Sequence, residues 1–169
     1  SEQWGIFCNF AKTPLTVKGY TFKSSEQLFQ LMKFTDVEVV RNILAGITRG
    51  GKKCHEVKKT VKSYEKEYRR DDWGCMIIDA MKFCLQTKYD QCEEFRNMLL
   101  ESKGYFIVED QTSFPKKSPD AWGVKLRDGK YIGPNLLGRL LMELRDCGKL
   151  EYKLPEGALD FSETLMQNQ

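Results

Sequence analysis

The sequence predicts a compact, mostly helical α+β fold in one domain, and three observations lead to this prediction. Stretches with apolar residues three and four positions apart fill most of the chain, which is typical of amphipathic helices. Strand-like stretches are few and short, so the expected sheets are small. A chain of 169 residues can bury one core and is too short for two ordinary domains. We expect the domain to span residues 1–149, followed by a C-terminal extension over 150–169.

The first half of the chain is expected to contain two short strands and several helices. The strands lie within residues 14–22, around a tight turn at Lys18-Gly19. Ser24 can cap a helix that runs to about residue 34, because a serine oxygen there accepts a hydrogen bond from a free backbone amide. Asp36 can cap a second helix that Gly46 closes. A flexible basic loop is expected at 49–53, and further helices over 55–68, 73–88 and 93–102.

The sequence of the second half predicts one strand, one long loop and one strongly amphipathic helix. Residues 105–109 form the most strand-like stretch of the chain. Residues 110–133 predict a loop because Gly, Pro and charged residues interrupt them, and loops of that length are usually functional or disordered. Its aromatic residues, Trp122 among them, make it a candidate ligand site. Pro134 is placed in the first turn of a helix that carries five leucines, and the tail after 149 predicts an extended arm.

Charge and composition allow an anionic partner without requiring one. The net charge is +3, from 27 Lys and Arg against 24 Asp and Glu. Basic stretches at 49–53, 116–117 and 125–130 lean slightly towards a nucleic acid partner. No apolar run approaches the roughly 20 residues of a membrane helix, and the N-terminal residues lack a signal-peptide pattern. We therefore expect an intracellular protein, cytoplasmic or nuclear, with no membrane partner.

The cysteines and the histidine argue against a metal site. The chain has six cysteines and one histidine, and no cysteine pair has C-x-x-C spacing, so a tetrahedral zinc site is not expected. Cys75, Cys84 and Cys92 lie in or beside expected helices and are interpreted as small buried apolar residues. This use of cysteine fits a reduced compartment rather than a disulfide scaffold.

One face of the helix that Ser24 opens carries side chains suited to catalysis. At about 100° per residue, the side chains that project in one direction are Glu26, Phe29, Gln30 and Lys33. A carboxylate, an amide, an amine and an aromatic ring therefore share this face. By spacing alone, a solvated surface stripe is the more common interpretation of such a face.

Spacing alone also gives structural interpretations of two other residues. Trp73 lies on an apolar stripe, as a core anchor would. Asp120, within S-P-D-A-W-G, fits a turn aspartate that bonds to backbone amides. Gly133-Pro134-Asn135 precedes a helix, and free amides at a helix N-terminus form a natural seat for phosphate.

Three groups of motifs in a fixed order say more about function than residue spacing alone does. The first is G-I-F-C-N-F-A from Gly5, followed by S-E-Q-L-F-Q-x-x-K-F from Ser25. The second is W…M…K-Y…L-L, from Trp73 to Leu100. The third, W-G and then G-x-N-x-L-G-x-L-L-M-x-x-R, ends at Arg145. In this order, over residues 4–147, they resemble the YbiA-like family, also called NADAR after an association with NAD and ADP-ribose.

The chain departs from the family pattern in two motifs. Cys8 stands where the family usually has a serine before Asn9. Asp120 lies two residues before Trp122, whereas the family's aspartate usually lies three residues before its tryptophan.

The resemblance implies a compact, mostly helical α+β fold and cleavage of the bond between ribose C1 and a base nitrogen. Such cleavage builds positive charge at C1, which a carboxylate stabilises while an acid protonates the leaving base. The resemblance assigns Glu26 to the reacting centre. Lys33 either binds phosphate or forms a Schiff base with the opened sugar, and Asp120 binds ribose hydroxyls or acts as the acid. The expected substrate-binding residues are Asn9, Phe10, Phe29, Gln30, Trp73, Trp122, Gly123, Gly133 and Asn135.

Three functions stay open at this point. The first is an ADP-ribosyl glycohydrolase that removes ADP-ribose from guanine in nucleic acid. The second is a hydrolase of the ribosylaminopyrimidine phosphates of riboflavin synthesis. The third is a module that binds ADP-ribose or NAD without turnover, which the joint presence of Glu26, Gln30 and Lys33 disfavours. The scheme requires no metal and no other cofactor.

Overall fold

The computed structural model describes residues 4–49 and 55–167. Apart from Arg49, the expected basic loop at 49–53 therefore lies outside the described residues. The chain divides into two compact units, the first made of residues 1–95 and 151–169 and the second of residues 96–150. No described helix is both long and apolar enough to cross a membrane.

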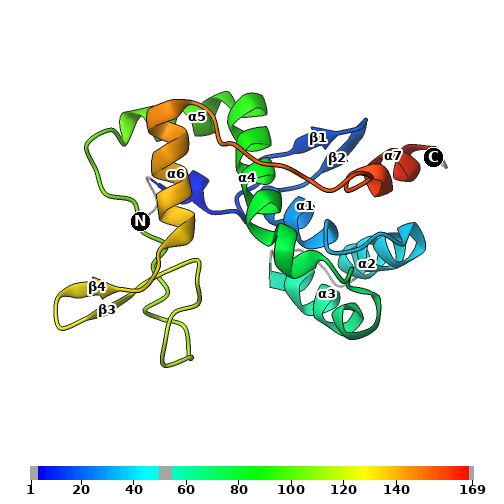
Figure 1. The fold of residues 1–169 in the computed structure, drawn as a ribbon, viewed down its shortest axis with the longest axis horizontal. Helices are drawn as coiled ribbons and strands as arrows, with labels where there is room; N and C mark the ends of the chain where they lie inside the picture. The colour runs from blue at the N-terminus through cyan, green and yellow to red at the C-terminus, as the bar shows by residue number, and fades with distance from the viewer. Residues whose placement is uncertain (1–3, 50–54, 168–169) are drawn as a thin grey trace. The chain divides into compact units, whose positions relative to one another are not determined.

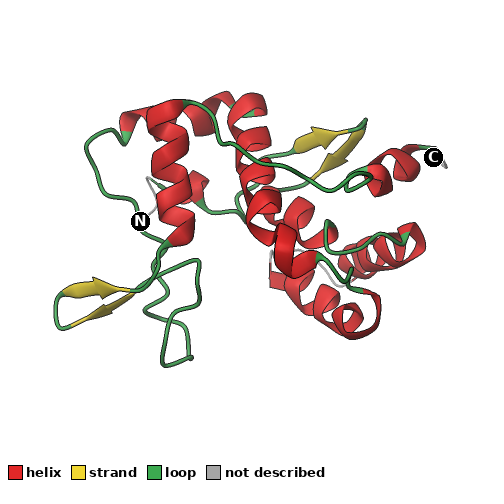
Figure 2. Cartoon of the chain, viewed as in Figure 1, coloured by secondary structure: helices red, strands yellow, loops and turns green. Residues whose placement is uncertain are grey.

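Helices make up most of the first unit (Figures 1 and 2). The two short strands pair antiparallel, with Leu15 opposite Phe22, as the sequence predicts. Both side chains are fully buried and begin the core, which α1 and α4 continue. The elements are the 3-10 helix η1 (Gly5–Phe7), strands β1 (Leu15–Val17) and β2 (Tyr20–Phe22), and helices α1 (Ser25–Leu31), α2 (Val37–Arg49), α3 (His55–Tyr68), α4 (Trp73–Gln91) and α7 (Asp160–Met166).

Helix α1 begins where the sequence predicts but ends earlier. The Ser24 hydroxyl accepts a hydrogen bond from the Gln27 amide at 3.1 Å, which is the expected N-cap. The helix ends at Leu31 rather than near residue 34. All seven of its residues are buried because α3, α4 and β2 pack around it. The interpretation of one face as a solvated stripe is therefore wrong.

Gly46 does not close α2, which continues to Arg49. A Cβ atom at Gly46 would lie 3.2 Å from Cγ2 of Thr60 in α3. The glycine therefore allows α3 to approach α2 closely, and its role is packing rather than termination. The predicted cap is confirmed, because a carboxylate oxygen of Asp36 accepts from the amide of Glu38 at 2.9 Å.

The C-terminal tail contains a helix, which corrects the expectation of an extended arm. Helix α7 lies beside the β1–β2 hairpin (Figure 1). The Ser162 hydroxyl donates to the carbonyl of Val17 at 2.6 Å, and the Phe161 ring contacts Phe22 at a centroid distance of 6.0 Å. The tail thus belongs to the first unit. The proposed division of the chain at residue 149 stays a prediction.

The second unit contains a hairpin that the sequence analysis assigned to a loop. Strands β3 (Lys125–Arg127) and β4 (Lys130–Ile132) pair antiparallel across Asp128-Gly129. Both turn residues have positive φ, 48° and 74°, as a two-residue hairpin turn requires. The Asp-Gly pair between two short β-rich stretches was the signal for this turn. Helices α5 (Glu93–Glu101), which starts in the first unit, and α6 (Leu136–Cys147) complete the second unit.

Residues 105–109 do not form the expected strand. Their only sheet-like pairing among the described residues is at their end, where the carbonyl of Glu109 accepts from the Val124 amide at 2.9 Å. Tyr105 and Phe106 are 67% and 75% exposed, whereas Ile107 is buried. Hydrophobicity alone indicated a strand, but the run lacks a neighbouring strand to complete a ladder.

The cysteines are less buried than expected. Cys84 is buried, but Cys75 is exposed and Cys92 is half-buried. The interpretation as buried apolar residues is therefore right for Cys84 and wrong for the other two. The described cysteines are all free thiols.

Candidate active site

Glu26 is a buried carboxylate in the first turn of α1. The residue is only 4% exposed, and its backbone amide donates to the carbonyl of Asn9 at 2.9 Å. Carboxylate oxygen Oε1 accepts from Nε2 of Gln30, one turn later, at 2.8 Å, and lies 3.4 Å from Nζ of Lys58. Both contacts go to Oε1, so Oε2 has no hydrogen-bond partner among the residues that the structure describes.

Asn9 joins the N-terminal segment to the start of α1. Its side-chain oxygen accepts from the Ser25 hydroxyl at 3.1 Å, and its Nδ2 donates to the sulfur of Met81 at 3.4 Å. Together with the hydrogen bond that the Glu26 amide donates to Asn9, these contacts hold the first turn of α1 from outside the helix. Asn9 was predicted to bind substrate, and the structure shows it fixing the position of Glu26.

The charge of Glu26 affects a neighbouring thiol. Cys84 on α4 is fully buried, and its Sγ lies 3.7 Å from the sulfur of Met32. Burial, and after it the negative charge of Glu26, raises the pKa of this thiol well above its usual range. Cys84 therefore stays a neutral thiol beside the carboxylate.

Lys33 lies beyond the end of α1 and has its own acidic partner. Its ammonium group forms an ion pair with Glu65 of α3 and lies 5.9 Å from the centre of the Trp73 ring. The ring of Trp73 packs against Phe29 at 5.3 Å with an interplanar angle of 57°. Both rings are buried, which fits the core-anchor interpretation of Trp73. The cluster combines an amine, a carboxylate and two aromatic rings.

Helix α3 supplies two residues that the sequence analysis missed. Lys58 contacts Glu26 and lies 4.8 Å above the Phe10 ring, while Glu65 pairs with Lys33. Neither residue was given a role from the sequence, which predicted only a helix over 55–68. Their spacing was a usable signal, because seven residues are two helical turns and the buried Val61 lies on the same face between them.

In the second unit, Asp120 fits the structural interpretation. Its Oδ1 accepts from the Trp122 amide at 2.9 Å and from Nε2 of Gln111 at 2.7 Å. Its own amide donates back to Oε1 of Gln111 at 3.0 Å. Asp120 is exposed and shapes the turn before Trp122. Its role as acid or ribose ligand stays a prediction.

The expected phosphate seat before α6 is occupied by backbone carbonyls, which corrects that prediction. The amides of Asn135, Leu136 and Leu137 donate to the carbonyls of residues 123, 121 and 122 at 3.1–3.2 Å. They are therefore not free to bind phosphate. Pro134 is also not in the first turn, since it precedes the N-cap residue Asn135.

Asn135 and two glycines fix the backbone around this helix start. The Asn135 side chain donates to the carbonyl of Ile107 at 2.9 Å and accepts from the Glu109 amide at 3.0 Å. Asn135 has a left-handed backbone with φ of 51°. Gly133 has φ of 145°, and a Cβ there would lie 2.5 Å from the carbonyl oxygen of Gly123. These three predicted binding residues are explained by folding, and a contact with substrate stays a prediction.

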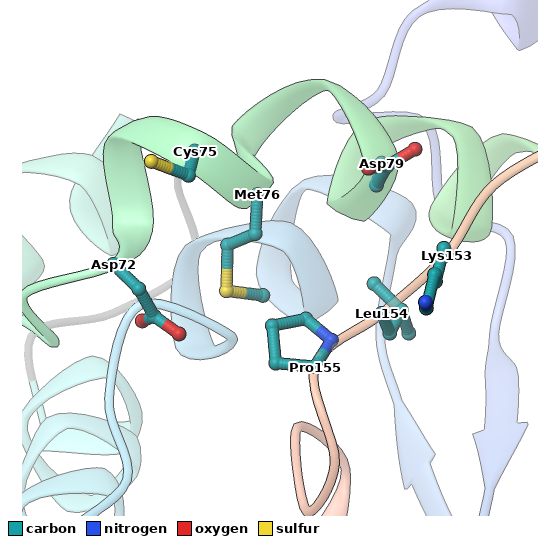
Figure 3. Close-up of a pocket in the computed structure, with 7 residues that line it drawn as sticks. All are labelled: Asp72, Cys75, Met76, Asp79, Lys153, Leu154 and Pro155. Atoms are coloured by element: carbon teal, nitrogen blue, oxygen red, sulfur yellow. The ribbon is translucent and has the colours of Figure 1, made fainter.

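A cavity of about 240 Å³ lies at the start of α4, in the first unit (Figure 3). The Met76 side chain points from α4 towards Pro155, and Lys153 and Leu154 lie next to Pro155 on the same segment (Figure 3). The sequence analysis assigned none of its lining residues to the site. They are Asp72, Cys75, Met76, Asp79, Lys153, Leu154 and Pro155.

The structure therefore brings the predicted residues together in two groups. In the first unit, one group surrounds the Glu26 carboxylate and the Lys33 amine. In the second unit, the other is ordered around the turn at Asp120 and the start of α6. No group of three or more His, Cys, Asp or Glu side chains suited to a metal ion occurs in the described part of the chain. The first group contains a carboxylate that can face positive charge and an amine with an adjacent carboxylate.

Comparison with known proteins identifies the family. A family model described as the NADAR domain matches residues 1–147. N-glycosidase YbiA of Escherichia coli K12 is 32% identical over 151 residues, which are 86% of this chain and 82% of that protein. A riboflavin biosynthesis protein of Vibrio vulnificus is 27% identical over 161 residues, 95% of this chain and 39% of that protein.

A solved structure confirms the predicted α+β fold class. The NMR structure of E. coli YbiA aligns with a TM-score of 0.64 at 29% identity, covering 90% of this chain and 84% of that one. At the level of the family, the comparisons support an N-glycosidase. The resemblance carried by the ordered motifs is confirmed, and the chain belongs to the NADAR domain family.

Proposed function

We propose that the chain hydrolyses the bond between ribose C1 and guanine nitrogen and so removes ADP-ribose from nucleic acid. The observation that carries the proposal is the Glu26 carboxylate, which is buried, held through Oε1 and has Oε2 without a partner in the described chain. A fixed carboxylate oxygen stabilises the positive charge that develops on C1 as the base leaves. The E. coli relative that bears the name N-glycosidase supports the reaction class.

Glu26 either stabilises the cation or activates the attacking water in this mechanism. Gln30 and Lys58 hold its Oε1, so the carboxylate is oriented before the substrate arrives. This preorganisation is the electrostatic source of catalysis, because no rotation of the side chain is needed during the reaction. Asp120 remains our proposed ribose ligand or acid for the leaving guanine.

Lys33 has two roles in the proposal, which a trapping experiment separates. As an ammonium it binds a phosphate oxygen. As a neutral amine it attacks C1 and displaces guanine, which leaves with a proton; opening of the ribose ring then gives a Schiff base, and water hydrolyses this to free ADP-ribose and the amine. In this route Glu65, which pairs with Lys33, accepts the proton that Lys33 must lose first. Borohydride trapping that Lys33→Ala abolishes would establish the covalent route, and no trapped species in the wild type would exclude it.

The second candidate is hydrolysis of a ribosylaminopyrimidine phosphate, which the Vibrio relative's name favours. Incubation with this compound and, separately, with an oligonucleotide carrying ADP-ribose on guanine distinguishes the two. We expect release of ADP-ribose from the oligonucleotide and little release from the pyrimidine substrate. The reverse result would establish the second candidate, and binding without release from either would indicate a binding module.

Substitution of Glu26 tests the catalytic assignment. Glu26→Gln keeps the size of the side chain but removes its charge, so we expect kcat to fall at least 100-fold, about 3 kcal/mol of transition-state stabilisation. Glu38→Gln makes the same change at an exposed carboxylate of α2 and should leave kcat unchanged. A fully active Glu26→Gln variant would show that this carboxylate is not at the reacting centre.

A further inference from the structure

The net positive charge of the chain comes from the second unit. Residues 96–150 contain ten Lys and Arg against seven Asp and Glu, whereas the rest of the chain has seventeen of each. Within the second unit, residues 111–133 hold five of the cations and two of the acids. The whole excess of three positive charges therefore lies in the β3–β4 hairpin and the loop before it.

Buried and bonded cations attach this loop to the hairpin. Lys125 is 7% exposed, and its Nζ donates to the carbonyls of Thr112 and Phe114 at 3.3 and 2.6 Å. The Leu126 amide donates to the Thr112 hydroxyl at 2.9 Å, and the Arg127 guanidinium donates to the carbonyl of Lys117. These hydrogen bonds thus attach the loop to the hairpin within the second unit.

The side chains left exposed here include both cations and aromatic rings. Phe114 and Tyr131 are 50% and 51% exposed, and Lys116, Lys117 and Lys130 are exposed as well. Tyr131 lies opposite Leu126 in the hairpin, so an aromatic ring and an aliphatic side chain share one face. Lys130 precedes Tyr131 in β4 and lies opposite Arg127, so its side chain is on the other face of the hairpin. We call these six residues, which span both faces, the hairpin surface: Phe114, Lys116, Lys117, Leu126, Lys130 and Tyr131.

We propose that the hairpin surface binds the strand of a nucleic acid. Proteins that hold single strands combine cations that contact phosphates with aromatic side chains on which bases stack. The hairpin surface offers both, and its charge is opposite to that of the strand. The inference rests on the proposed function, since it names the surface that would hold a guanine-modified substrate, and it adds residues outside the predicted catalytic and binding groups.

Binding of an unmodified strand tests the surface without requiring catalysis. A fluorescein-labelled single-stranded DNA is titrated with the full chain at several salt concentrations, and anisotropy is measured. The variant Lys116→Ala/Lys117→Ala/Lys130→Ala should bind at least 10-fold more weakly and should lower the salt slope by about 2, since each contacted phosphate of a single strand contributes about 0.7. Tyr131→Ala should weaken binding about 5- to 100-fold with an unchanged slope.

A matched charge control separates this surface from net charge alone. Lys59→Ala/Lys62→Ala/Lys66→Ala removes three exposed cations from α3 and should change the affinity less than twofold. An equal loss in both triple variants, or equally tight binding of polyglutamate, would overturn the proposal. Unchanged thermal midpoints of the variants would confirm that they are folded.

Activity assays distinguish failure of this inference from failure of the proposed function. The hairpin variants should keep the wild-type kcat/KM on ADP-ribosylated guanosine, which has no strand, and should raise KM at least 10-fold on the modified oligonucleotide. If the wild type cleaves the nucleoside but does not bind the strand, the proposed binding surface is wrong and the proposed function still holds. If the wild type binds the strand but cleaves neither substrate, the proposed function is wrong and the proposed binding surface still holds.

Discussion

Lys88 gives the most demanding test of the structure, because it is a cation in the core of the first unit. The residue is 0% exposed on α4, its Nζ donates to the carbonyls of Ile6 and Cys8 at 2.6 and 3.1 Å, and it lies 4.6 Å from the centre of the Phe95 ring. Burial lowers its pKa from 10.5 to about 8, although the thiols of Cys8 and Cys92 act in the opposite direction.

The lowered pKa predicts the sign and size of a pH effect on stability. Between about pH 8 and 10.5 the unfolded chain keeps the proton of Lys88 and the folded chain has released it. Because the unfolded state then binds more protons, this group makes the free energy of unfolding rise with pH, and that gain is lost as the pH falls through about 8. At about 1.4 kcal/mol per pKa unit, the gain is roughly 2–3 kcal/mol between pH 7 and 10.

Urea unfolding of Lys88→Met at pH 7 and pH 10 measures this effect. Methionine cannot titrate and leaves the carbonyls of Ile6 and Cys8 without their donor, so the variant should be less stable than the wild type, and the gap should widen by roughly 2 kcal/mol at pH 10. Lys82→Met on the same helix, whose Nζ donates to the carbonyl of Glu151 at 3.0 Å, is the control and should show no widening. Parallel pH profiles of the wild type and Lys88→Met would refute the reasoning.

Three further predictions concern the second unit and the Lys33 cluster. Asn135→Ala removes one buried and one part-buried hydrogen bond and should lower the free energy of unfolding by about 2–3 kcal/mol in urea titrations, whereas a loss below about 0.5 kcal/mol would contradict the role given to that side chain. Gly138→Ala would place Cβ 2.3 Å from the carbonyl oxygen of Ile107 and should lower the free energy of unfolding by about 3 kcal/mol or more. Gly74→Ala, with open space around its Cβ, is the control and should raise the free energy of unfolding by about 0.5–1 kcal/mol. Similar thermal shifts for both variants would contradict the packing. Glu65→Gln should lower the yield of borohydride-trapped adduct at least 10-fold if Lys33 acts covalently, and an unchanged yield would exclude Glu65 as its base.

Local sequence signals predicted much of the fold correctly. The caps at Ser24 and Asp36 depend on side chains that reach amides two or three residues away, so sequence was sufficient to find them. The turn at Asp128-Gly129 carried an equally local signal that was overlooked in a loop rich in glycine and charge. The strand expected at residues 105–109 failed for a different reason, since a strand exists only if a partner strand completes its hydrogen bonds.

The candidate site was predictable only in part. The ordered motifs selected Glu26 and Lys33 directly, and helical spacing placed Gln30 one turn from Glu26. The same spacing favoured a solvated face, because the period of a helix does not reveal whether neighbouring elements cover that helix on all sides. The free amides expected before α6 were likewise lost to carbonyls more than ten residues away in the chain.

By itself the sequence determined the family, the fold class and most helix positions, and it led to the prediction of Glu26 and Lys33 as site residues. Tertiary structure alone decided which charges meet: Lys58 contacts Glu26, and Glu65 pairs with Lys33. It also decided that Asn135 holds the backbone at Ile107 and Glu109. The physical reason is that periodicity and capping act within a few residues, whereas ion pairs and buried hydrogen bonds depend on which distant segments pack together.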